Sequence, residues 1–353
     1  MINWFKPDVG FDDLDLVKKS ILKNYINEGE LVFQFENKCK NLLKSNYALS
    51  TTSGTMSLYI ALKALNIGHN DEVLVPDLSY IAAANAVNMT GAKPIFVETS
   101  KVDLLIEVEN LQKFITKKTK AIIPVHVSGR GSNILKIKQF AKKNQIYLIE
   151  DAAEAFYSKY KNSFLGTFGD IGCFSFSPNK IITTGQGGLI VTNNKKISKF
   201  IKMFKNQGRS EIGTGGDDNH KIRGTNLRLT NLQAAIGLSQ LKKLESRAKK
   251  LRSHYLFYKK NLNKKFKLFH FRDEELPLWT DVHVEKRDKL LSYLNHKKID
   301  CRKFWRPMSQ QKSYNVKVKN FNFFNNLFWL PSSFNLDNSK KNYICKTLNN
   351  YKS

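Results

Sequence analysis

The chain has 353 residues, of which 41% are hydrophobic and 25% are charged. This length and composition allow one large domain with a full core and a smaller second domain. No segment approaches the ~20 apolar residues that a membrane-spanning helix needs, and the start of the chain lacks the basic residues and apolar core of a signal peptide. We therefore expect a cytoplasmic protein that does not bind a membrane.

The formal net charge is +28, which raises the question of a nucleic-acid partner. The densest basic run, residues 241–270, holds eleven Lys and Arg against the single acid Glu245. Its apolar residues recur every three or four positions, which is typical of an amphipathic helix with a solvated lysine face. We favour this solvated face over a polyanion site and predict no nucleic-acid partner, although the positive field would attract a diphosphate-bearing substrate.

Between residues 50 and 195, short apolar runs alternate with helical patterns. This alternation predicts an α/β domain with a largely parallel sheet. In such sheets ligands bind outside the carboxyl ends of the strands, and the unusual polar residues of this chain directly follow the apolar runs. The predicted strands are residues 72–76, 94–98, 121–127, 147–150, 172–177 and 189–192, and the predicted helices lie near 53–65, 79–90, 132–144 and 195–206.

The rest of the chain divides into a loop and a second domain. Residues 207–225 are rich in glycine and charge without periodicity, which predicts a long, functional loop. After the basic helix we expect a smaller domain with a strand at residues 277–282. The predicted boundary places a large cofactor-binding domain at 1–245 and a small domain at 246–353.

Small hydroxyl residues and a glycine precede the first predicted helix of the alternating region. The run Ser50-Thr51-Thr52-Ser53-Gly54-Thr55 would leave backbone N–H groups free to meet an anion at the helix start. An ordinary N-cap by Ser53 is the simpler interpretation of this run taken alone.

Two carboxylates, Glu150 and Asp151, follow a predicted strand, and Glu154 comes one turn later. No nearby His or Asp set has metal-ligand spacing, and the four cysteines form no C-x-x-C pair, so we predict no metal site and no disulfide framework. Asp151 by itself could equally cap the next helix.

Lys180 directly follows another predicted strand and a Pro-Asn turn, and the glycine-rich stretch 185–188 comes after it. Taken alone, such a lysine is more often a surface residue. Together, the helix start, the aspartate and the lysine match the needs of pyridoxal 5′-phosphate. Its aldehyde needs a lysine, and its pyridine nitrogen needs a carboxylate. Its phosphate needs hydrogen-bond donors from backbone N–H groups and hydroxyls.

These motifs make nearly the whole chain resemble the DegT/StrS-type sugar aminotransferases, whose fold is the fold type I of aspartate aminotransferase. That resemblance implies an α/β large domain, with a mostly parallel mixed sheet flanked by helices, and a smaller C-terminal α+β domain. The order and spacing of many short fragments carry it: Phe35-Glu36, Ser53-Gly54-Thr55, Val125-His126, Glu150-Asp151-Ala152-Ala153-Glu154-Ala155, Gly169-Asp170, Phe174-Ser175-Phe176, Asn179-Lys180, Gly185-x-Gly187-Gly188, Gly224-Thr225-Asn226-Leu227-Arg228 and Trp329-Leu330-Pro331-Ser332-Ser333.

By this resemblance, Lys180 is the catalytic residue that holds the cofactor covalently and moves the proton. Asp151 is implied as the partner of the ring nitrogen, and Tyr80 as the aromatic residue stacked on the ring. Glu154 would lie near the ring hydroxyl, where the family has glutamine or glutamate. Gly54, Thr55 and Ser175 are implied as phosphate ligands.

The family likeness also implies partners. Asn226 resembles an asparagine that reaches the phosphate from a neighbouring subunit, which implies a homodimer with shared active sites. The expected reaction moves an amino group from glutamate to a nucleotide-linked keto-sugar for amino-sugar and surface-polysaccharide synthesis. The stretch 179–184 looks most like members that aminate C-4 of 4-keto-6-deoxy sugars, with C-3 amination equally open.

Some residues depart from the family pattern or have no evident role. Gln186 replaces the usual glutamate of the Gly-Glu-Gly-Gly turn, Cys301 stands where threonine is common, and the roles of His126 and Arg130 are not indicated. Lys180 argues against members that dehydrate sugars, since those typically lack the lysine. A regulatory protein without turnover and a nucleic-acid-binding protein stay as alternatives.

Overall fold

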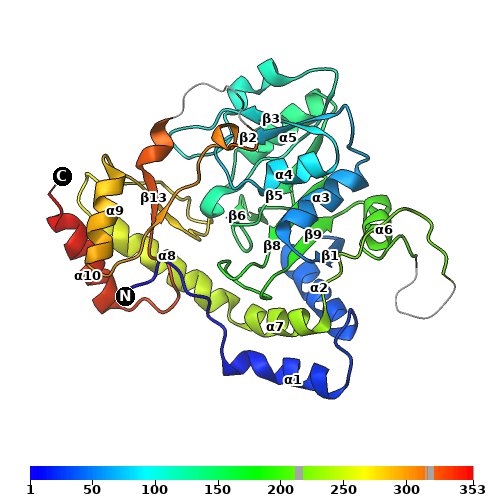
Figure 1. Ribbon diagram of the computed structural model, residues 1–353, viewed down its shortest axis with the longest axis horizontal. Coiled ribbons are helices and arrows are strands. Elements are labelled where there is room, and N and C mark those ends of the chain that lie inside the picture. Colours follow the sequence, from blue (N-terminus) through cyan, green and yellow to red (C-terminus); the bar gives the residue numbers. More distant parts are fainter. Residues whose placement is uncertain (211–217, 315, 317–321, 353) are drawn as a thin grey trace.

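The computed structural model describes residues 1–210, 218–314, 316 and 322–352. Within them, seven strands form one sheet in the order β1-β9-β8-β5-β4-β2-β3 (Figure 1). The bounds of these strands are β1 Tyr47–Thr51, β2 Glu72–Pro76, β3 Lys93–Val97, β4 Thr119–Ile122, β5 Tyr147–Asp151, β8 Ile171–Ser175 and β9 Gly188–Thr192.

The neighbours β3, β2, β4, β5 and β8 pair in parallel, whereas β9 pairs antiparallel with both β8 and β1. Helices cover both faces, which explains why the strands read as nearly continuous apolar runs. One core holds side chains of α3, α4 and α6, and another, built around α5, contains different residues of the same strands. The helices are α3 Gly54–Ala64, α4 Ala82–Met89, α5 Ile134–Lys143 and α6 Lys195–Phe204.

The predicted α/β fold with a mostly parallel mixed sheet is confirmed, and the predicted strands and helices of residues 50–195 are present. Some details differ. The strand predicted at 121–127 ends at Ile122, and residues Val127–Gly129 form a 3-10 turn in which Ser128 has a positive φ of 55°. The edge strand β1 and the two-residue strands β6 (Lys159–Tyr160) and β7 (Ser163–Phe164) were not predicted. The predicted loop at 207–225 includes residues 211–217, which lie outside the described residues.

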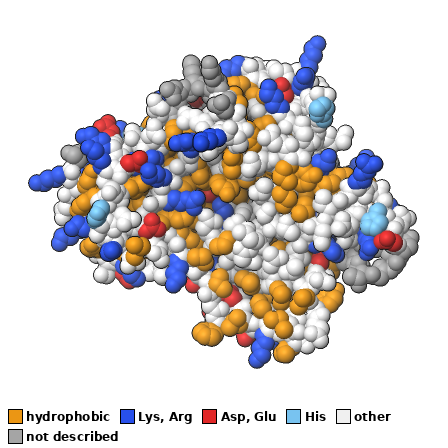
Figure 2. Space-filling view, in the orientation of Figure 1, with side chains coloured by type: hydrophobic (Ala, Val, Ile, Leu, Met, Phe, Trp, Pro, Cys, Tyr) orange, Lys and Arg blue, Asp and Glu red, His pale blue; other side chains and the backbone are white. Residues whose placement is uncertain are grey.

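The basic run, residues 241–270, forms the end of α7 (Asn231–Lys242), the whole of α8 (Leu244–Asn261) and the strand β10 (Lys267–Leu268) rather than a single helix. The predicted amphipathic arrangement is confirmed, because Leu251, Tyr255 and Tyr258 are buried while the lysines of α8 are exposed. Figure 2 shows Lys and Arg side chains scattered over several parts of one face. Among the described residues, no helix combines the length and the apolar composition that crossing a bilayer requires.

A second sheet of four strands follows, in the order β10-β11-β13-β12, and we call it the C-terminal sheet. The strand predicted at 277–282 begins only at Thr280. Ile2 pairs with Ile299, so the start of the chain runs beside this sheet (Figure 1). The remaining elements are α1 Leu14–Leu22, α2 Glu30–Leu43, β6 Lys159–Tyr160, β7 Ser163–Phe164, β10 Lys267–Leu268, β11 Thr280–His283, α9 Arg287–His296, β12 Arg302–Lys303, β13 Leu327–Leu330 and α10 Asn338–Asn350.

Candidate active site

A cavity of about 370 Å³ lies where β5 and β8 end and α3 begins, and residues of the C-terminal sheet complete its wall. Of the eight predicted site residues, seven line this cavity: Gly54, Thr55, Tyr80, Asp151, Glu154, Ser175 and Lys180. The eighth, Asn226, does not line it and is exposed. Residues far apart in the sequence therefore meet at the edge of the sheet where ligands bind in such folds.

The start of α3 is built to face an anion. The Ser53 hydroxyl accepts a hydrogen bond from the Met56 N–H at 3.2 Å, so the simple interpretation of Ser53 as an N-cap is confirmed. The first N–H groups of a helix have no acceptor within it, and Gly54 and Thr55 carry two of them. A Cβ at Gly54 would stand 2.8 Å from that of Ser175, so only glycine lets the helix approach the end of β8 this closely. The N-cap and an anion site are compatible, because the Ser53 cap leaves the N–H groups of Gly54 and Thr55 free.

Asp151 is the last residue of β5 and is only 5% exposed. One of its carboxylate oxygens accepts a hydrogen bond from the Ala153 N–H at 3.1 Å, and within the described residues the other has no hydrogen-bond donor. Burial raises the pKa of Asp151 to about 6, against the opposing effects of that hydrogen bond and of the Lys180 charge. The carboxylate therefore lacks a cation, and a protonated ring nitrogen would supply one.

Lys180 lies in the turn after β8, where its N–H donates to the Ser177 carbonyl at 3.0 Å. Its ammonium Nζ is 3.2 Å from Glu154 Oε1, and only 12% of the side chain is exposed. The same Glu154 oxygen accepts a hydrogen bond from Trp279 Nε1 at 3.0 Å, and the other accepts one from the Ser128 N–H at 2.8 Å. All three partners are donors, so both carboxyl oxygens of Glu154 act as acceptors.

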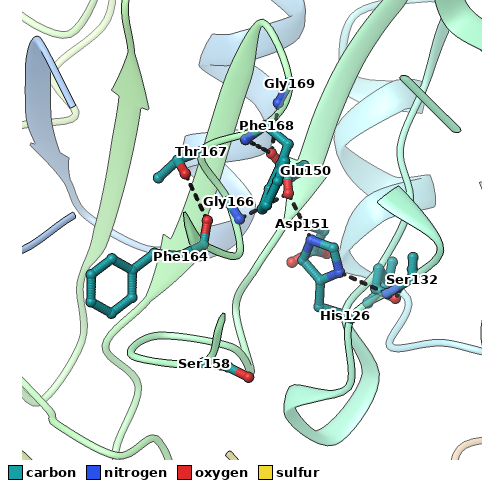
Figure 3. Close-up of polar contacts among 12 residues, drawn as sticks. His126, Ser132, Glu150, Asp151, Ser158, Phe164, Gly166, Thr167, Phe168 and Gly169 are labelled. Atoms are coloured by element: carbon teal, nitrogen blue, oxygen red, sulfur yellow. Dashed lines mark hydrogen bonds and ion pairs between the residues drawn. The ribbon is translucent and has the colours of Figure 1, made fainter. Parts of the chain in front are cut away.

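Glu150, next to Asp151 in the strand, points to the opposite side, as alternate strand residues do (Figure 3). It accepts hydrogen bonds from the N–H groups of Phe168 at 2.6 Å and Gly169 at 2.7 Å and from His126 Nε2 at 2.9 Å. The Ser132 N–H donates to His126 Nδ1, so the imidazole proton lies on Nε2. Glu150 and His126 are fully buried and do not line the cavity; they fix the backbone behind it.

Arg130, whose role the sequence did not indicate, joins the two sheets. Its guanidinium is buried and pairs with Asp281 of β11, and it donates from Nε to the Asp103 carbonyl at 3.0 Å. Asp281 also accepts a hydrogen bond from the Ser128 hydroxyl at 2.7 Å and one from Trp329 Nε1 at 2.6 Å. Because the N–H of the same Ser128 holds Glu154, this network ties the C-terminal sheet to the lysine pocket.

Sequence reasoning missed one side of the cavity. All four tryptophans of the chain line it, together with Arg302: Trp4, Trp279, Trp305 and Trp329. The rings of Trp4 and Trp279 lie 4.7 Å apart, and Trp305 lies 6.2 Å from Tyr80. The scarcity of tryptophan was the one available signal, because positions so distant in sequence carry no local pattern.

Comparisons with known proteins give the family of the chain. The model of the DegT/DnrJ/EryC1/StrS aminotransferase family matches residues 7–349. The chain belongs to this family. It is 37% identical to GDP-perosamine synthase of Escherichia coli O157:H7, over 99% of the chain and 98% of that protein. It is 31% identical to GDP-perosamine synthase of Vibrio cholerae, over 99% of both.

Solved structures of family members have the same fold. Helicobacter pylori PseC, an aminotransferase involved in the biosynthesis of pseudoaminic acid, superposes with a TM-score of 0.92, at 26% identity over 98% of each chain. DesV from S. venezuelae gives 0.90 at 26% identity, over 96% of this chain and 93% of its own. The chain is thus a pyridoxal-phosphate-dependent aminotransferase with the expected fold.

The cavity fits this cofactor by its own chemistry. It holds an amine at Lys180, a carboxylate in need of a cation at Asp151, and a helix start with free N–H groups at Gly54. These match the aldehyde, the ring nitrogen and the phosphate, respectively. Of the described residues, no group of three or more His, Cys, Asp or Glu is placed to hold a metal ion.

The raised pKa of Asp151 predicts a pH-dependent effect of Asp151→Asn on the cofactor-free protein. As pH rises from about 4 to 6, the Asp151 carboxyl loses its proton in the unfolded chain before it does so in the folded protein. Its ionisation therefore lowers the free energy of unfolding by up to about 3 kcal/mol. Asparagine avoids that cost. Urea unfolding should show equal stability at pH 4 and a more stable variant at pH 8; a variant that is no more stable at pH 8 would contradict the assignment.

The donors around Glu154 predict that Glu154→Gln is not a conservative change. The amide NH₂ would face a donor, either Trp279 Nε1 and Lys180 Nζ or the Ser128 N–H. We expect a loss of about 1–3 kcal/mol in the free energy of unfolding of the cofactor-free protein, measured in urea. Glu245→Gln, at a side chain 71% exposed, is the matched control and should change stability by less than about 0.5 kcal/mol. Equal effects at the two positions would rule out the donor arrangement.

Proposed function

We propose that this aminotransferase moves an amino group from glutamate to a nucleotide-linked keto-sugar, at C-4 of a 4-keto-6-deoxy sugar, for the synthesis of amino sugars in surface polysaccharides. One observation carries the proposal: Lys180, Asp151 and the start of α3 converge on one cavity. The choice of sugar and carbon is supported by the similarity to two GDP-perosamine synthases over the full length of the chain. Amination at C-3 is the alternative.

In this proposal, Gly54, Thr55 and Ser175 bind the phosphate, and Asp151 keeps the ring nitrogen protonated. Tyr80, which is 54% exposed and lines the cavity, offers its ring as a stacking surface. When bound, pyridoxal phosphate supplies a carbonyl for the amino group and a ring that accepts electrons from the reacting carbon.

Lys180 has two proposed tasks: it anchors the cofactor and, once released, its Nζ carries a proton between the cofactor's exocyclic carbon and the substrate carbon. Glu154 holds this amine in place through the contact at 3.2 Å. Because Trp279 and Ser128 fix the carboxylate, the amine can leave and return to the same position. The same residues serve both halves of the reaction.

We further propose a homodimer in which Asn226 completes the partner's site. Asn226 Oδ1 accepts a hydrogen bond from Arg228 Nε at 3.2 Å, and this Nε is 4.0 Å from Glu28. Asn226 therefore lies close to the end of the N-terminal segment 9–26, whose exposed apolar side chains gather at the bottom of Figure 2. A patch of this kind marks a protein contact, and we assign it to a second copy. Its large exposed members are Val9, Phe11, Leu14, Ile21, Leu22, Tyr25 and Ile26.

A substrate panel tests the activity. The cofactor-loaded protein is given glutamate and nucleotide-linked 3-keto or 4-keto-6-deoxy sugars, and 2-oxoglutarate is measured. We expect turnover with a 4-keto sugar and no turnover with Lys180→Ala. Borohydride should attach the cofactor covalently to the wild-type protein and not to this variant. Turnover with the 3-keto sugars alone would select C-3. A loaded wild-type protein without turnover on any sugar would instead support the regulatory alternative.

Mixing two inactive variants tests the shared site. In a heterodimer of Lys180→Ala and Asn226→Ala, one of the two sites keeps both native residues if Asn226 acts across the dimer. Equal mixing should then restore activity to about a quarter of the sites, because half of the dimers are mixed. If Asn226 acts within its own chain, no mixed site is intact and the activity will not rise above that of the separate variants.

A further inference from the structure

The described residues that line the cavity include two cationic side chains, Lys180 and Arg302. Lys180 contacts the carboxylate of Glu154. Arg302 has no ion pair or hydrogen bond from its guanidinium to any described residue, although its neighbour Lys303 pairs with Asp288 at 3.0 Å. The cavity wall therefore presents one cation without a counter-anion.

Aromatic contacts hold this guanidinium. Its central carbon is 4.9 Å from the ring centroid of Trp4 and 5.7 Å from that of Trp329, which lies opposite Arg302 in the β12–β13 pair. A guanidinium packed on aromatic rings keeps its in-plane N–H donors free, and their fork matches the two oxygens of a carboxylate or phosphate. Such packing also limits the side-chain entropy that binding would otherwise cost.

The start of the chain supplies one of the two rings. The N–H of Trp4 donates to Asp300 Oδ2 at 3.1 Å, and its carbonyl accepts from the Ser332 N–H at 2.9 Å. The Lys6 N–H donates to Ser333 Oγ at 2.8 Å. These contacts attach the N-terminal residues to the C-terminal sheet, so Trp4 is a fixed part of the wall.

Three buried arginines of the chain contrast with Arg302, which is exposed and lines the cavity. Arg130 pairs with Asp281, Arg247 with Asp8, and Arg287 with Asp288, and the first two also lie over phenylalanine rings. Each of these three arginines has a carboxylate partner, and in the first two cases the carboxylate accompanies the aromatic packing. At Arg302 the aromatic support is present and the carboxylate is absent, which leaves the place of an anion open inside the cavity.

We propose that Arg302, supported by Trp4 and Trp329, binds an oxyanion group of a substrate in the cavity. This group is the carboxylate of the amino donor or a phosphate of the nucleotide-linked sugar. The inference rests on the proposed function and adds a substrate-binding residue to the same site. Lys180 and Asp151 serve the cofactor, whereas Arg302 faces the incoming molecule from the C-terminal sheet.

The two half-reactions of the cofactor-loaded protein separate the two sources. Glutamate is added to one sample, and the 4-keto sugar nucleotide is added to a sample already aminated by glutamate; the cofactor's absorbance reports each step. Arg302→Leu should weaken the apparent affinity for one of them about 10- to 100-fold, the loss of one charged hydrogen-bonded contact, with little change in limiting rate. An effect on glutamate identifies the carboxylate, and an effect on the sugar nucleotide identifies the phosphate.

Two variants complete the design. Arg302→Lys keeps the charge and should recover part of the lost affinity, and Lys303→Leu, on the same short strand, should leave both half-reactions unchanged. Unchanged affinities in Arg302→Leu, or a fall in limiting rate alone, would overturn the inference. If the wild-type protein itself fails to react with glutamate, the proposed function fails. Calorimetric titration with 2-oxoglutarate and with GDP then still tests the role of Arg302. If wild type and Arg302→Leu bind each of these two probes with the same affinity, the inference is refuted.

Discussion

A buried carboxylate is costly until a cation faces it, and Asp151 imposes this constraint on the whole site. Burial at the end of β5 raises its pKa to about 6, and the nearby Lys180 charge offsets only part of the burial effect. The ring nitrogen of pyridoxal phosphate is a group that can meet this need, because protonation makes it cationic. A carboxylate placed in this way would favour the protonated ring, which is the form that best accepts electrons from a reacting carbon.

The wall of the cavity is built from both sheets. The parallel sheet alone ends in an open edge, and the C-terminal sheet and the N-terminal residues cover it with tryptophan rings. The buried ion pair of Arg130 with Asp281 fixes the relative position of these parts. A buried pair of this kind is weak evidence for stability, but its geometry specifies one arrangement. Here the arrangement matters because Ser128 links Asp281 to Glu154, and Glu154 contacts the Lys180 amine.

The sequence predicted the parts that local chemistry determines. Strands 72–76 and 147–150 were recognised because both faces of a parallel sheet are covered and the runs are continuously apolar. The lysine, the aspartate and the helix start followed from where they stand relative to those runs. The sequence could not predict which of Glu150 and Asp151 lines the cavity, since this depends on the face of β5 to which each side chain points. The contributions of Trp4, Arg302 and Arg130 depend on tertiary packing and leave no local signal.

The site also shows why the reaction is easier to infer than the substrate. The residues matched to the cofactor come from strand ends and one helix start of the parallel sheet, whereas the opposite wall comes from the chain start, β11, β12 and β13. Substitutions in that second wall can change the shape offered to a sugar without moving Lys180 or Asp151. Of the two departures from the family pattern, Gln186 lines the cavity from the turn before β9 of the parallel sheet, while Cys301 does not line it and precedes Arg302 in the chain. The motif around Lys180 belongs to the first of these walls, which is why it alone could not decide between C-3 and C-4.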